Sequence, residues 1–275
     1  MSTLLPGGES MADNKLAVFV KPWKSLSLPE LGAHVRRLGF TWIELPVRPG
    51  FPVEPDSIER ELPKAAAILR EEGVQILNIT ADLPLDDERL YAACAEAGVS
   101  MNRVMFRRGN LPYWEAERAA REQLDAALPL CEQYGVQIGV QNHAGNFVAV
   151  HELGLYHLLK DYDSRHVGAI WDAAHNALQG MDLDAALDVV APYLCCVNLK
   201  NGFWQRTNGP EAEFAQWKVY WTSGRHGRAS WPTVVERLRA MDYRGPICLT
   251  AEYSDHGAAD RLIVEDLAFL HSLLS

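Results

Sequence analysis

The chain has 275 residues, of which 48% are hydrophobic and 23% charged, a composition typical of a globular protein with a substantial core. Its net charge of −10 argues against a general binder of nucleic acids or of anionic membranes. No apolar run reaches the roughly 18 residues of a membrane span.

The N-terminal residues and the cysteines of the chain predict a cytoplasmic protein. Residues 1–14 lack the charged and apolar segments of a signal peptide, so we expect a flexible tail there and one domain over residues 15–275. The five cysteines are odd in number, show no C-x-x-C spacing and lie mostly in apolar runs. We therefore expect reduced core thiols.

Short hydrophobic stretches alternate with longer amphipathic ones along the chain. The predicted strands are Lys15–Val20, Thr41–Leu45, Val74–Ile79, Val99–Phe106, Val136–Val140, Val167–Trp171, Leu194–Leu199 and Pro246–Ala251. The first predicted helix begins near Ser27 and ends at Gly39, and the others are Ser57–Glu72, Asp86–Gly98, Trp114–Tyr134, His151–Tyr162, Leu183–Val190, Trp231–Met241 and Ala258–Leu274. A polar, aromatic-rich loop is predicted over Gly202–Ser230.

Eight strand-then-helix units of this length predict a parallel sheet closed into a single-domain (β/α)8 TIM barrel. The alternative is an open, doubly wound sheet. That fold usually shows a glycine fingerprint after the first strand, and none is present here.

A polar residue lies at or just past the end of each predicted strand. These residues are Lys21, Glu44, Thr80, Arg107, Gln141, Asp172, Lys200 and Glu252. Any one of them could be a solvated loop residue. In a closed barrel the whole set would converge on the face where such barrels carry their active sites.

The second half of the chain supplies candidate metal ligands. Asp172 and Glu252 are hard oxygen donors suited to Mg²⁺ or Mn²⁺. Gln141 and Asn198 could add neutral amide oxygens to the same ion.

The same region supplies candidate catalytic groups. His143 and His175 are candidates for acid–base chemistry or substrate binding, because imidazole titrates near neutral pH. Lys200 could neutralise an enolate oxygen, and a carboxylate such as Glu252 could move a proton off and onto a sugar carbon.

Several stretches of the chain resemble the xylose isomerase-like TIM-barrel superfamily of sugar isomerases and epimerases, which also holds inosose dehydratases and endonuclease IV. They are GVQIGVQNHAG, VGAIWDAAHN, VNLKN, LTAEY and the late loop SGRHGRASWPTVVERLRAMDYRGPI. The resemblance spans nearly the whole chain. It implies that four strands supply Glu, Asp, His and Glu to one divalent metal, with the two glutamates as the acid–base pair.

Carried over residue by residue, the resemblance makes Asp172 a metal ligand and Glu252 both a ligand and a proton-transfer group. His175 corresponds to a substrate-contacting histidine, Glu44 to a glutamate near the substrate, and Lys200 to the lysine of an H-x-K-D run.

Three positions depart from the family pattern. Gln141 replaces the first glutamate, Asn198 the metal histidine, and Asn201 the following aspartate. An amide oxygen binds a hard cation more weakly than a carboxylate and cannot act as a general base near neutral pH. A divalent metal (Mn, Mg or Zn) is therefore expected to bind weakly or not at all.

These observations favour a sugar or polyol isomerase or epimerase, or an inosose dehydratase-like lyase, acting by proton transfer next to a carbonyl. The alternative is a non-catalytic carbohydrate-binding or partner protein on the same barrel. A nuclease like endonuclease IV would need more metal ligands and a basic surface. We expect a small sugar or polyol as partner, no nucleic acid or membrane, and a homo-oligomer as an open possibility.

Three further residues are candidate substrate contacts. Trp204 lies in the aromatic loop, which could pack on the barrel or cover apolar sugar faces. Arg107 and Arg228 could bind a phosphate or carboxylate, although solvated arginines fit these positions equally well.

Overall fold

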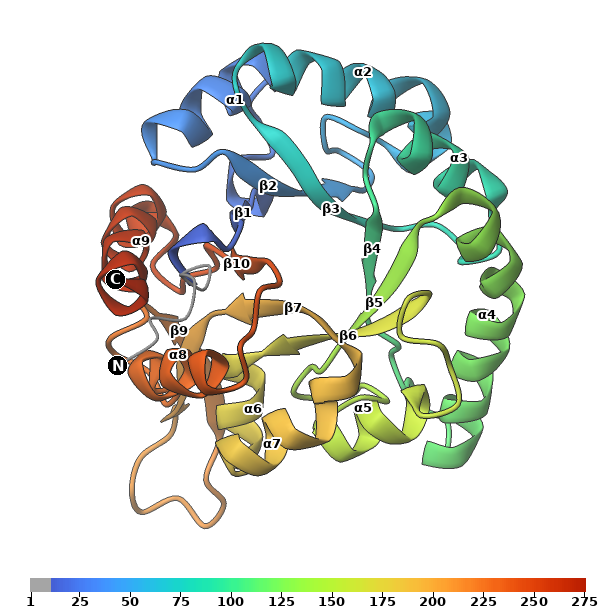
Figure 1. The fold of residues 1–275 in the computed structure, drawn as a ribbon. Coiled ribbons are helices and arrows are strands. Elements are labelled where there is room, and N and C mark those ends of the chain that lie inside the picture. Colours follow the sequence, from blue (N-terminus) through green and yellow to red (C-terminus); the bar gives the residue numbers. More distant parts are fainter. Residues whose placement is uncertain (1–10) are drawn as a thin grey trace, which may run out of the picture.

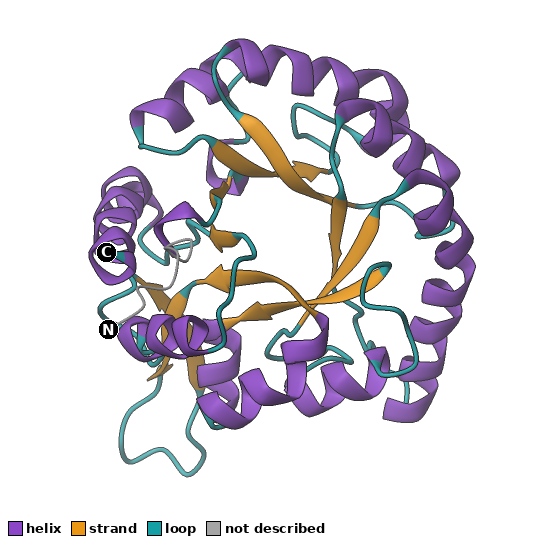
Figure 2. Ribbon diagram, viewed as in Figure 1, coloured by secondary structure: helices purple, strands orange, loops and turns teal. Residues whose placement is uncertain are grey.

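The computed structural model describes residues 11–275, which form a closed barrel of parallel strands inside a ring of helices (Figures 1 and 2). The order around the barrel is β1-β10-β7-β6-β5-β4-β3-β2, with β8 and β9 in a separate hairpin. The predicted (β/α)8 barrel is confirmed. The barrel strands are β1 Leu16–Phe19, β2 Trp42–Val47, β3 Gln75–Ala81, β4 Met101–Val104, β5 Gln137–Gln141, β6 Val167–Asp172, β7 Leu194–Leu199 and β10 Ile247–Leu249.

The helices end mostly within one or two residues of the predicted bounds. They are α1 Leu28–Arg37, α2 Ile58–Glu71, α3 Glu88–Ala97, α4 Tyr113–Tyr134, α5 Glu152–Leu159, α6 Ala173–Gln179, α7 Leu183–Val190, α8 Trp231–Ala240 and α9 Ala259–Leu274. Glycines in the left-handed conformation follow several of them, for example Gly135 after α4.

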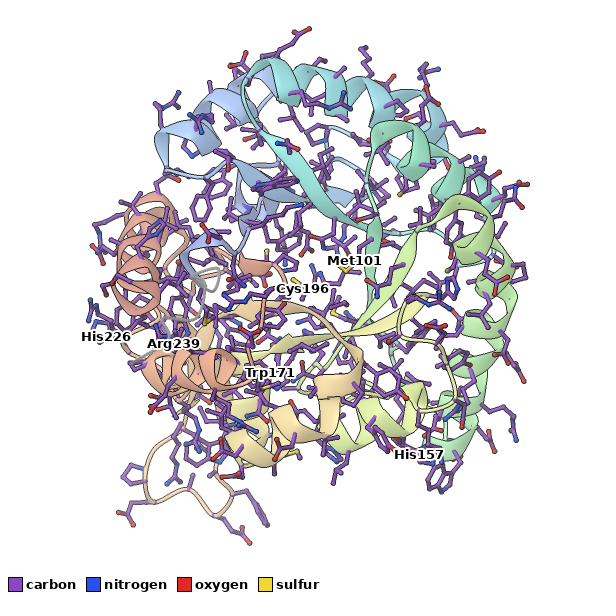
Figure 3. The ribbon with its side chains drawn as sticks, viewed as in Figure 1. Met101, His157, Trp171, Cys196, His226 and Arg239 are labelled. Carbon is purple, nitrogen blue, oxygen red and sulfur yellow. The ribbon has the colours of Figure 1, made fainter. Side chains whose placement is uncertain are left out.

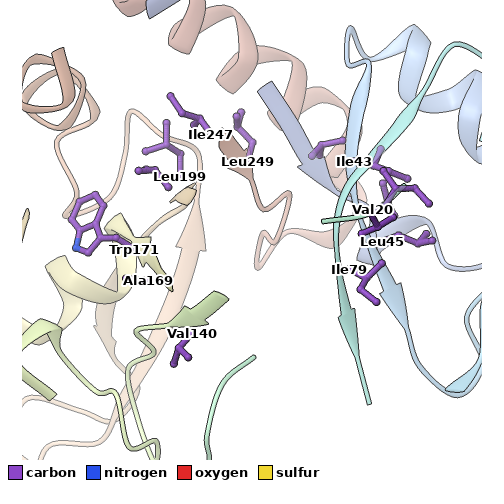
Figure 4. Close-up of a cluster of buried hydrophobic side chains, with 14 of the residues drawn as sticks. Val20, Ile43, Leu45, Ile79, Val140, Ala169, Trp171, Leu199, Ile247 and Leu249 are labelled. Atoms are coloured by element: carbon purple, nitrogen blue, oxygen red, sulfur yellow. The ribbon is translucent and has the colours of Figure 1, made fainter. Parts of the chain in front are cut away.

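The barrel strands separate two hydrophobic cores. The larger core lies between the strands and the helices and includes the fully buried Trp171 (Figure 4). A smaller cluster fills the barrel interior and includes Phe19, Met101, Ile170 and Cys196; Figure 3 shows Met101 and Cys196 near the barrel centre. The two cores explain why the strand sequences are hydrophobic at successive positions.

A polar layer lies directly above the interior apolar cluster. Side chains two apart on a strand share a face, so Met101 is followed on its face by Arg103, and Ile170 by Asp172. The inward face therefore changes from apolar to charged within one step of the pleat, at the carboxyl ends of the strands.

The structure differs from the sequence prediction in two segments. The short helix α6 follows β6 at once and was not predicted, because its seven residues are few for a periodic pattern. Part of the predicted loop Gly202–Ser230 is the antiparallel hairpin of β8 (Asn201–Arg206) and β9 (Trp217–Thr222). A polar stretch separates the two strands, so their pairing cannot be recognised from the sequence.

The packed chain begins earlier than the predicted boundary at residue 15. Residues 1–10 of the predicted tail lie outside the described residues. Met11 is buried in the larger core, and Asn14 Nδ2 donates to Gly245 O at 2.7 Å. The first turn, Met11–Asp13, is thus part of the domain.

The base of the hairpin tolerates no side chain at Gly227. A Cβ placed there would overlap the side chain of Asn201, which also binds Gly224 O and Ala229 O at 2.8 Å each. We expect Gly227→Ala to lower the free energy of unfolding by about 1–3 kcal/mol in urea denaturation. Gly209→Ala is the control, because a Cβ at Gly209 meets nothing within 4 Å. Equal effects of the two substitutions would contradict the close packing.

Candidate active site

A chain of buried polar side chains crosses the barrel mouth from β2 to β6. Arg103 donates from Nε to Glu44 Oε1 at 2.5 Å, forms an ion pair with the same oxygen through Nη2, and donates from Nη1 to Gln141 Oε1. Gln141 Nε2 then donates to Asp172 Oδ2 at 3.0 Å. Arg103 also lies over the Phe19 ring, 4.7 Å from its centroid. The mouth is therefore organised around a buried guanidinium.

Asp172 is fully buried and has a structural partner for each oxygen. Its Oδ1 accepts from the backbone N–H groups of Ala174 and His175 at 3.0 and 3.1 Å, so it caps the N-terminus of α6. Burial raises the pKa of Asp172 to about 6, and the positive charge of Lys200 opposes that rise. Capping explains why an aspartate ends this hydrophobic strand.

Glu252 lies between two lysines. Its Oε2 accepts from Lys200 Nζ at 2.7 Å and its Oε1 from Lys21 Nζ at 2.5 Å. Burial alone would raise the pKa of Glu252, but the two lysines hold it well below its usual range. Ala251, just before it, has a φ of 49°, an uncommon conformation for a residue with a side chain.

Trp221, at the end of the hairpin, closes one side of this group. Lys200 Nζ lies 3.7 Å from the centroid of its ring, and the ring of His175 meets it edge-on at 5.4 Å. Trp221 N and O are bonded to Ser254 in the loop after β10. The hairpin thus brings an aromatic face into the mouth beside the lysine.

The two histidines have opposite tautomers. His143 Nδ1 lies 2.8 Å from Ala144 O, which can only accept, so the proton is on Nδ1 and Nε2 carries the lone pair. His175 Nδ1 accepts from Ala144 N at 3.2 Å, so its proton is on Nε2, 4.0 Å from Asp172 Oδ2. Burial lowers the pKa of His143 to about 4 and that of His175 well below 6.5, so both rings are neutral at pH 7. Of the two, only His143 has a basic nitrogen, Nε2, without a hydrogen-bond partner among residues 11–275.

Two cavities open at this end of the barrel. One of about 560 Å³ is lined by Lys21, Trp221 and Glu252, with Lys24 and His256 on its wall. The second, of about 590 Å³, is lined by residues that include Arg103 and Arg107, and Arg48 lies on the wall of both. Their volumes suit a monosaccharide-sized ligand.

The structure brings together most of the residues predicted for the site. Glu44, Gln141, Asp172, His143, His175, Lys200 and Glu252 form the connected set described above. Arg107 borders the second cavity. Trp204 and Arg228 lie apart from the two cavities: Trp204 Nε1 donates to Leu178 O, and Arg228 Nε donates to Ala177 O.

The predicted metal ligands do not fit a divalent ion. Within residues 11–275, no group of three or more His, Cys, Asp or Glu side chains is arranged to hold one. The amide oxygen of Gln141 is turned to Arg103, and both oxygens of Glu252 are bonded to lysines. Asn198 is buried, and its Nδ2, a donor, is the atom that has no partner in the described structure.

Sequence reasoning missed Arg103 and did not single out Trp221 from the other rings of the aromatic loop. A signal for Arg103 was present: it lies within a predicted buried strand, where a charge requires a partner. For Trp221 there was no such signal, because seven aromatic residues lie in or beside that loop and only the fold selects one of them.

Glu152 holds the side chain of Asn142, which in turn binds the backbone of Asp172. It accepts from Asn142 Nδ2 at 2.8 Å and Trp171 Nε1 at 2.9 Å, and Asn142 Oδ1 accepts from Asp172 N. Burial raises the pKa of Glu152 from 4.5 to about 7. Between these values the folded protein keeps a proton that the unfolded chain releases, so this group lowers the stability as the pH rises.

Glu152→Gln is expected to remove that contribution. As the pH rises from 4.5 to 7.5, the free energy of unfolding of Glu152→Gln should increase, relative to that of the parent, by up to about 3 kcal/mol. Urea denaturation of both proteins at the two pH values measures the difference. Asp125→Asn, an exposed carboxylate on α4, is the control and should show little change. A pH-independent difference for Glu152→Gln would contradict the raised pKa.

A closed (β/α)8 barrel with converging charged groups at the carboxyl ends of its strands has the architecture of barrel enzymes. The family model described as "xylose isomerase-like TIM barrel" matches residues 33–273, and the chain belongs to that family. A comparison with curated proteins finds no match. No helix among residues 11–275 has the length and apolar character needed to cross a bilayer.

Solved structures of the same fold include three that cover nearly all of the chain. A xylose isomerase-like barrel protein from Mycobacterium smegmatis in complex with magnesium has a TM-score of 0.71 and 16% identity, covering 98% of this chain and 100% of its own. An L-ribulose 3-epimerase has a TM-score of 0.72 and 14% identity, covering 95% and 94%. The apo 3-keto-D-glucoside 4-epimerase from E. coli has a TM-score of 0.70 and 15% identity, covering 94% and 99%.

Proposed function

We propose that the protein is a sugar or polyol isomerase or epimerase that transfers a proton next to a carbonyl group. The observation that carries the proposal is the Lys21–Glu252–Lys200 cluster: Lys21 and Glu252 line an open cavity, and the neutral His143 lies close enough to interact electrostatically with Lys200 and Glu252. The proposal also extends to this chain the keto-sugar class named for two similar proteins, the 3-keto-D-glucoside 4-epimerase and the L-ribulose 3-epimerase.

The lysines supply the positive charge that such a reaction needs. When a proton leaves the carbon next to a carbonyl, negative charge develops on the carbonyl oxygen as the enediolate forms. The Lys200 ammonium is held in place by Glu252 and by the Trp221 ring, so it can stabilise that oxygen without reorganising. Lys21, on the other side of Glu252, adds a second positive charge.

Two groups are available to move the proton. His143 Nε2 carries a free lone pair and accepts the proton from the substrate carbon. Glu252 is the second group: when negative charge on the substrate oxygen offsets the charge of the two lysines, the pKa of Glu252 rises from its low value and it can exchange a proton with the enediolate. Return of the proton to the same carbon from the other side gives an epimer, and return to the neighbouring carbon gives an isomer. A dehydratase would instead expel a hydroxyl from the enediolate.

The test is deuterium exchange. The protein is incubated in D₂O with a panel of ketoses, 3-keto glycosides and inososes, and proton NMR follows the signal next to the carbonyl. We expect loss of that signal for at least one sugar, and slower loss with His143→Gln. Calorimetry on the same panel completes the test. Sugar binding without exchange would overturn the proposal in favour of a carbohydrate-binding protein, and so would exchange rates that Glu252→Gln leaves unchanged.

A further inference from the structure

The strongest feature that the proposed function does not use is the buried Arg103. Its side chain is 6% exposed and that of Glu44 is 1% exposed, so this ion pair lies inside the barrel rather than on its rim. Its donors reach two predicted site residues from different strands, Glu44 on β2 and Gln141 on β5. A fixed positive charge therefore lies among the residues that the family pattern assigns to a metal and its surroundings.

Gln141 matches this arginine in a way that a carboxylate would not. Its amide accepts from Arg103 with the oxygen and donates to Asp172 with the nitrogen, 3.0 Å from Oδ2. A primary amide has both capacities, whereas an ionised carboxylate only accepts. Glutamate at this position would place its second oxygen against Asp172, with no proton between two negative charges.

Each carboxylate at the barrel mouth already forms an ion pair or accepts a hydrogen bond within the protein. Glu44 has Arg103, Glu252 has Lys21 and Lys200, and Asp172 has Gln141 and the N-terminus of α6. A hard divalent ion needs several oxygens with free lone pairs. It would also lie close to a guanidinium that cannot lose its charge.

We infer that Arg103 is a built-in substitute for the divalent metal and that Gln141 is the residue that adapts the site to it. The barrel mouth then keeps a positive centre in the absence of any ion, and it excludes divalent cations by repulsion. This inference concerns the chain's own residues and holds whether or not the proposed reaction is correct.

The test compares three proteins by thermal unfolding in EDTA and in Mn²⁺, with elemental analysis after dialysis. The parent should contain only trace metal and should unfold at the same temperature in both solutions. Gln141→Glu adds a carboxylate but keeps Arg103, and its unfolding temperature should also be the same in Mn²⁺ and in EDTA. The double variant Arg103→Gln, Gln141→Glu removes the guanidinium and adds the carboxylate, so Mn²⁺ should raise its unfolding temperature by several degrees.

The outcomes separate a metal substitute from a merely structural arginine. Stoichiometric metal in the parent, released by EDTA with a fall in the unfolding temperature, would overturn the inference. So would a response of Gln141→Glu to Mn²⁺, or a folded double variant that does not respond. If the double variant folds only with Mn²⁺, the inference is supported. If it folds in neither solution, the parent and Gln141→Glu decide the question.

Discussion

Replacement of Lys200 by methionine is expected to lower the rate of proton exchange about 100-fold or more, with a smaller effect on sugar binding. The lysine is buried, bonded to Glu252 and positioned against the Trp221 ring. Methionine keeps much of the apolar stem but removes the charge that stabilises the enediolate oxygen. Glu252 keeps only Lys21, so its pKa should move up toward the usual range. Exchange followed by NMR, at several pH values, measures both effects.

Lys24→Met is the matched control, because Lys24 is exposed on the wall of the cavity that Lys21 and Glu252 line. It removes a lysine charge from that cavity but leaves the Glu252 cluster intact. Equal losses in the two variants would mean that the cavity acts through its overall charge. An unchanged rate in Lys200→Met would remove Lys200 from the proposed mechanism.

The second large effect is on stability. Arg103→Gln should lower the free energy of unfolding by about 3–5 kcal/mol, because it leaves the Glu44 carboxylate buried without its partner. The double variant Glu44→Gln, Arg103→Gln should recover part of the loss, since no unpaired charge remains. Urea denaturation of the parent, both single variants and the double variant gives the coupling between the two residues.

Arg107→Gln provides the comparison for Arg103. Arg107 is exposed at the strand end and lies over the Phe147 ring, 4.8 Å from the centroid. Its replacement should change the stability by less than about 1 kcal/mol. A cost for Arg103→Gln no larger than that for Arg107→Gln would contradict the buried ion pair.

Arg103 and Arg107 illustrate one limit of prediction from the sequence. The pattern of strand ends identifies Arg107, which follows its strand, but not Arg103, which lies within it. The structure gives the interior position the central role, because its side chain points inward above Met101. The difference depends on which strand face turns inward and which strands lie beside β4.

Asp172 illustrates a second limit. The sequence placed it at the end of a buried strand and made it a ligand, and the position is correct. Its oxygens are instead used by α6 and Gln141. Helix α6 and its cap, Asp172, escape prediction for the same reason: a helix of seven residues can be recognised in a sequence mainly by its capping residue.

Local sequence patterns are enough to predict the (β/α)8 barrel and the polar set at its mouth, because alternation of strand and helix and the chemistry of strand ends are local properties of the chain. The folded structure is needed to show that a guanidinium bridges Glu44 and Gln141, that two lysines hold Glu252, and that Trp221 faces the site. These contacts join residues from about 20 to more than 200 positions apart. They depend on barrel closure and strand register, which no local pattern specifies.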